Sequence, residues 1–363
     1  MSELSSAPRL DQLGFYTLGG HVESPRQMLT ELAQAEELGL GQAFLSERLN
    51  VKEACALSGA AGASTESIGI TTAATNHNTR HPAITAAFAT TMHKLTGGRF
   101  TLGLGRGLRP QLAGMGLAPV TTAQLEEFAA LMRRLWKGET VRDYAGLLGT
   151  FPKIALNEDF DEDIPIGITA FGPATLALAG RSFDVVVLHT FFSDDTVRRC
   201  VEAVRVAAEQ AGRDPAAVKI WSCYATVTTD LDEQTVLLKT VGRMATYLQV
   251  YGDLLVKTNN WSAADLERFR NAEVVCNLTR WADELRDVTV LHQLREAIPQ
   301  EWLDCAAVGS AAECAQKVRN QFDLGVDGVI MHGATPGELA PIVHSYRDQF
   351  LRTALLQPEE LTR

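Results

Sequence analysis

Apolar and polar positions alternate between two patterns along the first hundred residues. Short apolar runs, such as LGFYTLG at residues 13–19, have the length and composition of buried strands. A loop follows each run, and then a segment with apolar residues at helical spacing, such as the one between Met28 and Leu38. Ser24 and Pro25 supply an N-cap and a first-turn proline for this helix. The pattern predicts strands that alternate with helices.

Eight apolar runs carry the strand pattern. They are residues 13–19, 41–46, 68–75, 99–105, 164–169, 183–190, 219–227 and 325–333. Strands separated by helices pair in parallel, because each return crossover needs a helix to cover the sheet face. Eight such units without a second compositional domain predict a closed (β/α)8 TIM barrel of the α/β class, with residues 1–363 as one domain. An open, doubly wound sheet is the structural alternative.

Two stretches interrupt this rhythm. Residues 138–163 end in the acidic run 157–163 and predict an exposed connection before the fifth strand. Residues 233–305 are too long for one crossover and show helical periodicity throughout. They predict a helical insertion between the seventh and eighth strands, which would cover the mouth of the barrel or form a dimer contact.

The composition limits the classes of partner. The chain has 44 acidic and 33 basic residues, and the net charge of −11 argues against nonspecific binding to nucleic acid or to an anionic membrane. No run approaches the roughly 18 to 20 apolar residues that cross a bilayer, and the first residues lack the features of a signal peptide. The six cysteines lie too far apart for a zinc knuckle or a CxxC pair, so no metal site is expected. We expect a cytoplasmic protein with a small-molecule substrate.

The distribution of charge is more informative than its sum. The 59 residues between Glu66 and Glu126 contain no acidic residue, where the chain average predicts about seven. One interpretation is a core segment rich in Ala, Thr and Gly that excludes acids. The other is a locally positive site for an anionic ligand. The basic residues of this stretch are Arg80, Lys94, Arg99, Arg106 and Arg109, together with His77, His81 and His93.

Reactive groups of a parallel barrel lie at the C-terminal ends of its strands. His21 follows the first predicted strand and His77 the third, and either imidazole could transfer a proton near neutral pH or be an ordinary loop histidine. Glu47 and Arg48 follow the second strand. They could form a surface ion pair, or Glu47 could accept hydrogen bonds from the N–H of a bound ring.

Two glycine-rich strand ends are candidate anion sites. Gly105, Arg106 and Gly107 would allow a ligand to approach the backbone beside a guanidinium that can hold phosphate; the alternative is a plain tight turn. Gly172 and Pro173 lead into a predicted helix whose N-terminal N–H groups could bind an anion, or they form an ordinary helix start. No triad, GxSxG elbow, Walker lysine or usable GxGxxG motif is present.

At these same residues the sequence resembles the luciferase-like monooxygenase superfamily and, within it, the branch that uses the deazaflavin coenzyme F420. The most specific block runs from TNHNTRHP at 75–82 to GRFTLGLGRG at 98–107, and further matching segments are 13–40, 43–48, 168–191 and 325–333. The resemblance covers most of the chain and is weakest over 233–305. It implies a (β/α)8 barrel with the coenzyme ring in its mouth, a homodimer and, in many members, a non-proline cis peptide after the third strand.

The resemblance also implies roles for single residues. Glu47 lies where F420-dependent dehydrogenases have an Asp at the ring edge, Arg48 replaces their His, and His21 falls where they have a Glu. With His77, these residues are the catalytic candidates. The residues expected to contact the coenzyme are Ser46, Thr72, Ala73, Ala74, Thr75, Asn76, Gly105, Arg106, Gly107, Phe171, Gly172, Pro173 and Ala174.

Hydride chemistry accounts for this pattern. The resemblance implies reversible hydride transfer between F420 and a small alcohol, carbonyl or activated alkene. In this hypothesis His21 is the acid or base, Glu47 orients the ring, and Arg106 anchors anionic groups with Arg80 or Arg109, where the third to fifth strands end. One alternative is an FMN-dependent monooxygenase that uses a separate reductase. The other is a coenzyme-binding protein without turnover.

Overall fold

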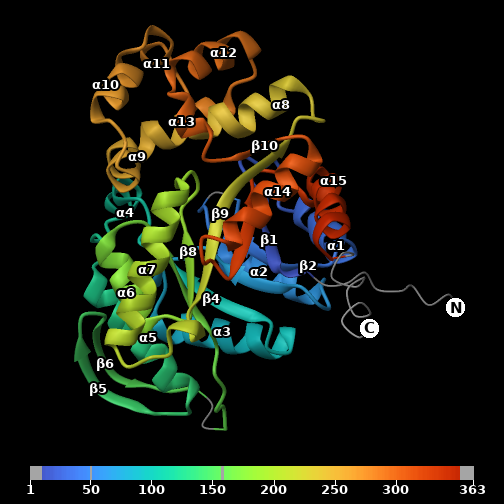
Figure 1. Cartoon of the computed structure of the whole chain (residues 1–363). Helices are drawn as coiled ribbons and strands as arrows, with labels where there is room; N and C mark the ends of the chain where they lie inside the picture. Colours follow the sequence, from blue (N-terminus) through green and yellow to red (C-terminus); the bar gives the residue numbers. More distant parts are fainter. Residues whose placement is uncertain (1–9, 50, 157–158, 352–363) are drawn as a thin grey trace, which may run out of the picture.

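The computed structural model describes residues 10–49, 51–156 and 159–351, and its centre is a closed barrel of eight parallel strands (Figure 1). The order around the ring is β9-β11-β1-β2-β3-β4-β7-β8, and pairing of β8 with β9 closes it. The predicted TIM barrel is confirmed. The strands are β1 Leu10–Thr17, β2 Leu40–Leu45, β3 Gly69–Thr72, β4 Phe100–Leu104, β7 Ile166–Ala170, β8 Val185–Leu188, β9 Lys219–Thr228 and β11 Gly328–His332.

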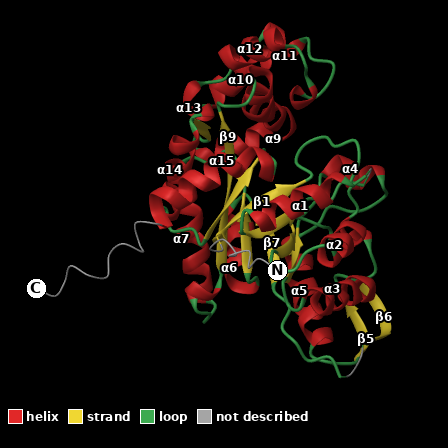
Figure 2. Cartoon of the chain, turned by 90° about the vertical axis from the view of Figure 1, so that its right-hand side faces the viewer, coloured by secondary structure: helices red, strands yellow, loops and turns green. Residues whose placement is uncertain are grey.

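Helices cover the outside of the barrel (Figure 2). Side chains at helix starts fix several boundaries; Thr121 and Gln124, for example, form a capping box at the start of α5. The first helix begins at Gln27, three residues after Ser24, because Ser24 and Pro25 belong to the preceding turn. The covering helices are α1 Gln27–Glu37, α2 Ala54–Ala63, α3 Pro82–Thr96, α5 Thr122–Trp136, α6 Pro173–Ser182, α7 Asp194–Gln210, α14 Ala311–Phe322 and α15 Pro336–Tyr346, with the short α4 at Arg109–Gly114.

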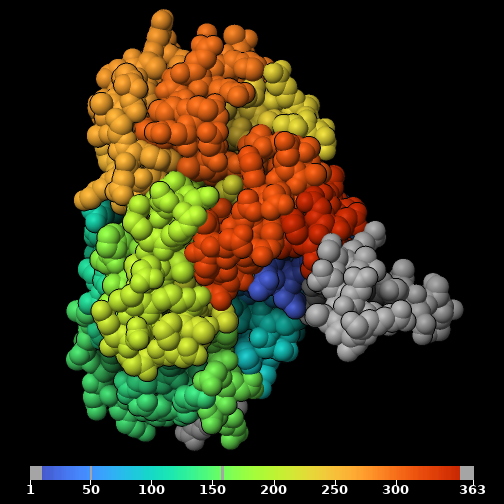
Figure 3. Space-filling view, in the orientation of Figure 1, coloured from blue at the N-terminus to red at the C-terminus, as the bar shows by residue number. Residues whose placement is uncertain are grey.

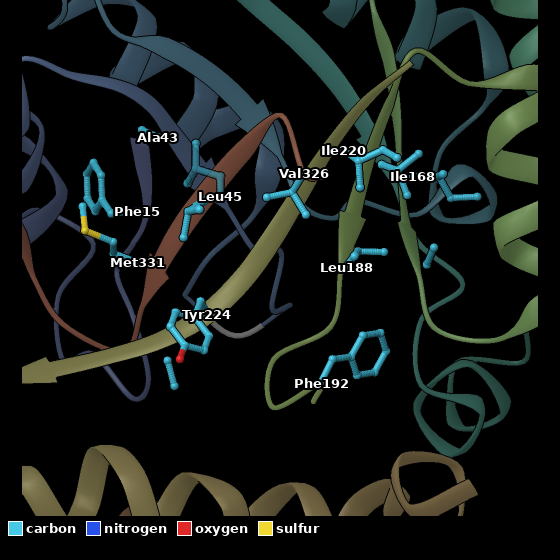
Figure 4. Packing of buried hydrophobic residues seen from close by; sticks show 14 of the residues in the cluster. Phe15, Ala43, Leu45, Ile168, Leu188, Phe192, Ile220, Tyr224, Val326 and Met331 are labelled. Carbon is cyan, nitrogen blue, oxygen red and sulfur yellow. The ribbon is translucent and has the colours of Figure 1, made fainter. Parts of the chain in front are cut away.

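Two apolar clusters stabilise the barrel. The larger one includes Phe15 and Leu45 and extends to the helices, and Figure 4 shows part of it. Successive side chains of a strand point to opposite faces, so the neighbouring Tyr16 and Phe44 belong to a second, smaller cluster. In that cluster the ring of Phe44 packs against Trp221, with centroids 5.1 Å apart. Burial on both faces explains why the barrel strands read as continuous apolar runs.

The stretch 138–163 contains regular structure that the sequence pattern did not reveal. β5 (Val141–Gly146) and β6 (Gly149–Ile154) form an antiparallel hairpin in which Tyr144 stacks on Phe151. Most of its side chains are exposed, so its strands lack the continuous apolar signal of the barrel strands. The exposed connection before the fifth barrel strand thus includes a hairpin. Positions 157 and 158 of the acidic run lie outside the described residues.

The segment from 233 to 305 is helical, and it joins the end of β9 to the short strand β10 (Ala307–Gly309), which pairs with β9. Figure 3 shows this segment as the orange and yellow block above the barrel. None of the described helices is long and apolar enough to cross a bilayer. The helices of this segment are α8 Glu233–Leu237, the π-helix Leu238–Gly242, α9 Arg243–Asn259, α10 Ala263–Asn271, α11 Glu273–Cys276, the 3-10 helix Ala282–Glu284, α12 Val288–Ala297 and α13 Gln300–Leu303.

Candidate functional site

The segment after β3 is held in place by a buried carboxylate. Glu47, whose side chain is 1% exposed, accepts a hydrogen bond from Thr75 Oγ1 at 2.7 Å and one from the backbone N–H of Ala54 at 3.2 Å, and it pairs with Arg80. The backbone N–H of Glu47 donates to the carbonyl of Ala74 at 3.2 Å. The peptide bond between Ala73 and Ala74 is cis, in the segment where the resemblance implies one. Glu47 therefore positions this segment, and its expected contact with a coenzyme ring stays a prediction.

Arg106 and the start of α6 form a second part of the site. The half-buried Arg106 guanidinium donates to the carbonyl of Val120 at 2.9 Å, to Thr122 Oγ1 at 2.7 Å and, at 3.3 Å, to Thr175 Oγ1 in the first turn of α6. Burial, and then the positive charge of Arg109, lower the pKa of Arg106. Its hydrogen bonds among the described residues all go to neutral oxygens. Two arginines thus lie close together, and no carboxylate in the described part of the chain bonds the half-buried one.

The N-terminus of α6 adds one backbone donor beside Arg106, the N–H of Ala174, because Pro173 has no N–H and the N–H of Thr175 donates to the carbonyl of Gly172 at 3.0 Å. Gly172 is the N-cap residue and makes no side-chain cap, and Pro173 occupies the first turn. The N–H groups of a helix start that lack a partner favour an anion. Gly172, Pro173 and Ala174 therefore lie, as the sequence predicted, next to the strand end that contains Arg106.

An aromatic cluster continues from this helix start toward α9. Phe171 lies 4.4 Å from the ring of His189 and 5.8 Å from that of Tyr251, measured between centroids. His189 Nδ1 lies 2.9 Å from the carbonyl of Thr190 and must donate to it, because a carbonyl only accepts. Its Nε2 therefore accepts from the Tyr251 hydroxyl at 3.0 Å. Burial lowers the pKa of His189 to about 4, so this ring is neutral at pH 7.

A buried histidine ends the last barrel strand. His332 Nδ1 lies 3.4 Å from Thr190 Oγ1, and its ring meets Tyr16 edge to face at 5.3 Å. Thr190 Oγ1 also lies 3.0 Å from Cys223 Sγ. Burial, together with nearby positive charge, holds the pKa of His332 well below its usual range. The described residues include no hydrogen-bond partner for the Nε2 of His332.

His21 joins the first barrel loop to the helical segment. Its Nε2 lies 3.2 Å from Asp283 Oδ1 and its Nδ1 lies 3.6 Å from Glu284 Oε1, and the side chain is 40% exposed. Asp283 also lies 3.6 Å from Nε of the buried Arg243, the first residue of α9. The role of His21 as acid or base stays a prediction.

His77 lies apart from the other candidate residues. Its ring packs against Phe128 of α5 with centroids 5.4 Å apart, and burial lowers its pKa to about 4. No described contact joins it to His21, to the aromatic cluster or to Arg106. Its role in proton transfer also stays a prediction.

The positive patch is smaller than the acid-free stretch suggested. Arg80 pairs with both Glu47 and Glu53, so the prediction that it anchors an anion is wrong. Lys94 pairs with Glu162, and Arg99 donates to backbone carbonyls that precede β3. Glu162 and Glu53 lie outside the acid-free stretch, so sequence position could not reveal that the fold brings them to these cations. The patch at the C-terminal ends of the strands reduces to Arg106 and the exposed Arg109.

The residues around Arg106 fit the phosphate and hydroxyl groups of a deazaflavin coenzyme. Asn76 Oδ1 is buried and has no hydrogen-bond partner among the described residues, so it can accept from a ligand hydroxyl. Gly107 has a φ of +68°, and a Cβ there would lie 2.8 Å from this oxygen. A side chain at position 107 would therefore close the space beside Asn76. Arg106, the N-terminus of α6 and Asn76 are the groups that would hold the coenzyme.

Sequence reasoning missed several polar residues near the mouth of the barrel. His189 and His332 lie at the ends of predicted strands, so their position alone could have added them to the candidates. Lys52, Arg243 and Tyr251 carried no signal, because two of them come from the helical segment and the third lies in a loop beyond Arg48. Only the folded chain brings them to the strand ends.

Curated enzymes resemble the chain over about half of its length. The 5,10-methylenetetrahydromethanopterin reductase of Methanolobus tindarius is 31% identical over 204 residues, which cover 54% of this chain and 60% of that protein. The F420-dependent glucose-6-phosphate dehydrogenase of Microbacterium testaceum is 32% identical over 170 residues, which cover 43% and 50%. The match thus spans between half and three fifths of the length of these relatives.

Solved structures share the fold over nearly the whole chain. The F420-dependent tetrahydromethanopterin reductase of Methanopyrus kandleri gives a TM-score of 0.76 at 18% identity, covering 93% of this chain and 99% of that one. The oxygenating component of 3,6-diketocamphane monooxygenase from Pseudomonas putida, in complex with FMN, gives 0.65 at 19% identity, covering 93% and 98%. Identities this low show the fold alone.

The family model described as luciferase-like monooxygenase matches residues 9–328, which include all eight barrel strands apart from the last four residues of β11. This chain belongs to the luciferase-like monooxygenase family.

Proposed function

We propose that the protein is an F420-dependent oxidoreductase that transfers a hydride between coenzyme F420 and a small alcohol, carbonyl or activated alkene. The observation that carries the proposal is the half-buried Arg106, which bonds only neutral oxygens among the described residues and lies beside the N-terminus of α6. This pair suits the phosphate of the coenzyme. The resemblance to the F420-dependent glucose-6-phosphate dehydrogenase supports the same coenzyme.

The chemistry divides between coenzyme and protein. The bound deazaflavin supplies a ring carbon that gives or takes a hydride. The segment fixed by Glu47 would hold and orient that ring. Phe171 lies between the Arg106 site and the pair formed by His189 and Tyr251. Neutral imidazoles and tyrosine hydroxyls in this low-dielectric region can hold or pass a proton. His21 is the exposed alternative for this step.

The substitution Arg106→Ala tests the anion site. Loss of a charge-assisted hydrogen bond to the phosphate should weaken F420 binding by about 1–3 kcal/mol. The affinity is measured by titrating the purified protein with the coenzyme and following its fluorescence. Arg295→Ala is a suitable control, because Arg295 is exposed on α12. Equal affinities of the two variants would contradict the assignment of Arg106.

An FMN-dependent monooxygenase is the second candidate, because a structure with the same fold was solved with FMN. The two candidates differ in what the purified protein retains and consumes. Tight FMN binding, with oxygen consumption when reduced FMN is supplied, would support the monooxygenase. Selective F420 binding supports the oxidoreductase. F420 binding without turnover on any alcohol, carbonyl or enone would instead indicate a binding protein.

A further inference from the structure

Gly20, in the loop after β1, brings two cationic side chains together: its carbonyl accepts from Lys52 at 3.3 Å, and a Cβ at this position would lie 3.1 Å from the guanidinium of Arg243. Both cations, and Arg48, act on the buried His332 at the end of β11. All three cations disfavour the protonated form of this ring. Arg48 and Lys52 belong to the loop after β2, whereas Arg243 begins α9 in the helical segment. The fold thus brings positive charge from two distant parts of the sequence to the end of β11.

Two of these cations are buried, and the ammonium of Lys52 has a donor to spare. Lys52 is 2% exposed, and its ammonium donates to the carbonyls of Leu18 at 2.8 Å and Gly20 at 3.3 Å, which uses two of its three N–H groups. Arg243 is 7% exposed, and its Nε faces the carboxylate of Asp283 at 3.6 Å. Buried charges normally have full sets of partners, because an unsatisfied one is costly. The third N–H of the buried Lys52 ammonium has no partner among the described residues, and this unused donor points to a ligand.

The carboxylates in contact with these cations do not balance them. Glu31 acts on Lys52 but accepts its hydrogen bonds from Thr17 Oγ1 at 2.6 Å and from the N–H of Leu18 at 2.7 Å. Asp283 lies beside Arg243 and also accepts from Thr246. Three cations against these two carboxylates leave one positive charge. That excess matches a monoanion better than a phosphate, which carries close to two negative charges at neutral pH.

The backbone at Leu18 adopts an unusual conformation beside Lys52. Leu18, a non-glycine residue, has a φ of +53°, in the left-handed region that side chains disfavour. In this conformation its carbonyl meets the Lys52 ammonium while its N–H meets Glu31. A conformation that costs free energy is retained here next to the buried lysine, as is common at ligand sites.

We propose that Arg48, Lys52 and Arg243 bind the carboxylate of the substrate, so that the reaction acts on a small monocarboxylic acid. The proposal rests on the F420-dependent function proposed above. A 2-oxo acid would accept a hydride at its carbonyl carbon and a proton, supplied by water, at its oxygen. The product is the 2-hydroxy acid, and the coenzyme passes from its reduced to its oxidised form as it gives up the hydride and one proton, which returns to the water. The reverse reaction oxidises the hydroxy acid and reduces the coenzyme.

Binding of pyruvate to the full chain without coenzyme tests the proposal. Isothermal calorimetry at constant ionic strength compares pyruvate with pyruvamide, its neutral analogue, and with inorganic phosphate. Pyruvate should bind at least roughly tenfold more tightly than either, since a charge-assisted contact contributes on that scale. Pyruvamide binding as tightly as pyruvate, or phosphate binding more tightly, would overturn the assignment.

Three variants locate the site. Lys52→Met should weaken pyruvate binding by roughly tenfold or more. Lys317→Met is the matched control and should leave pyruvate binding unchanged. Lys317 lies on the outer helix α14, and its ammonium also donates to a backbone carbonyl, that of Val308, at 3.2 Å. If Lys52→Met does not fold, Arg48→Met gives the same test at an exposed position. Pyruvate affinity unchanged in the folded variants of Lys52 or Arg48 would overturn the proposal.

A parallel F420 titration separates the two proposals. Lys52→Met should keep the F420 affinity of the parent within roughly twofold, because Lys52 does not belong to the Arg106 site. Normal F420 binding by a protein that does not bind pyruvate would overturn the carboxylate site and leave the coenzyme assignment intact. Failure of the parent to bind F420 would overturn the coenzyme assignment, and the coenzyme-free pyruvate titration would still decide the carboxylate site.

Discussion

Lys52 is a charged side chain in a position with almost no solvent. Burial, reinforced by the positive charges of Arg48 and Arg243, lowers its pKa to about 8, and Glu31 opposes the shift. The folded protein therefore holds the protonated lysine at a cost in stability below pH 8. Such a cost is common where a residue serves binding rather than folding.

The lowered pKa of Lys52 predicts how the stability of the protein depends on pH. Between pH 8 and the ordinary lysine pKa of 10.5 the unfolded chain binds the proton that the folded chain has lost, so stability rises with pH across this window. Relative to Lys52→Met, the free energy of unfolding of the parent should rise by about 1–3 kcal/mol from pH 8 to 10.5. Urea unfolding at several pH values measures the difference. A constant difference would show that Lys52 titrates normally.

Some residues of the site could be predicted from the sequence, and others could not. Arg106, Gly107 and Gly172 follow strands, and the rule that ligands bind at strand ends was enough to select them. Arg80 also follows a strand, but its partners Glu47 and Glu53 were not predictable from spacing. Lys52 and Arg243 depend on packing between the loop after β2 and the helical segment, which no local pattern encodes.

At the scale of elements, α9 is adapted to bring Tyr251 to the barrel. Tyr251 has φ −147° and ψ 36°, which are not helical values, in the middle of this helix. Its hydroxyl donates to His189, and its ring lies beside Phe171 and Tyr247. The kink thus coincides with the contact between the helical segment and the end of β8.

Removing that hydroxyl tests the contact. Tyr251→Phe keeps the ring but leaves His189 Nε2 without its donor, which should lower the free energy of unfolding by about 1–2 kcal/mol. Tyr346→Phe is the matched control, because Tyr346 is buried on α15 and its hydroxyl has no partner among the described residues. Chemical denaturation measures both variants. Equal losses in the two would contradict a specific bond to His189.

The sequence predicts the strands that are buried on both faces of the sheet. All eight barrel strands overlap the apolar runs, because helices outside and side chains inside exclude polar residues from both faces. The hairpin of β5 and β6 faces solvent, and β10 has only three residues, so neither produces a strong pattern. Helix boundaries shifted by a few residues where turn residues resemble caps, as at Ser24.

At the scale of the whole molecule, α2 and α3 leave an apolar surface uncovered. The two helices pack side by side, and Ile84 and Leu95, about three helical turns apart on α3, are 59% and 47% exposed. Lys94 is the only Lys, Arg, Asp or Glu in either helix. Exposed apolar surface of this kind is typical of a protein interface.

This surface predicts a homodimer. The parent should sediment at about twice 39.4 kDa, and Ile84→Glu should shift it toward the monomer, because an isologous interface buries the new charge twice. Analytical ultracentrifugation measures the mass. Leu254→Glu is the matched control, because it places the same charge at an exposed apolar position of α9, away from α2 and α3. A monomeric parent would contradict the prediction.

We infer that this barrel couples F420 to a small substrate whose carboxylate binds Arg48, Lys52 and Arg243. The most direct test mixes the purified protein with oxidised F420 and lactate and follows the deazaflavin absorbance without oxygen. We expect the coenzyme to be reduced, with one pyruvate formed for each coenzyme consumed. An unchanged absorbance, together with FMN binding and oxygen consumption in a parallel assay, would contradict this inference.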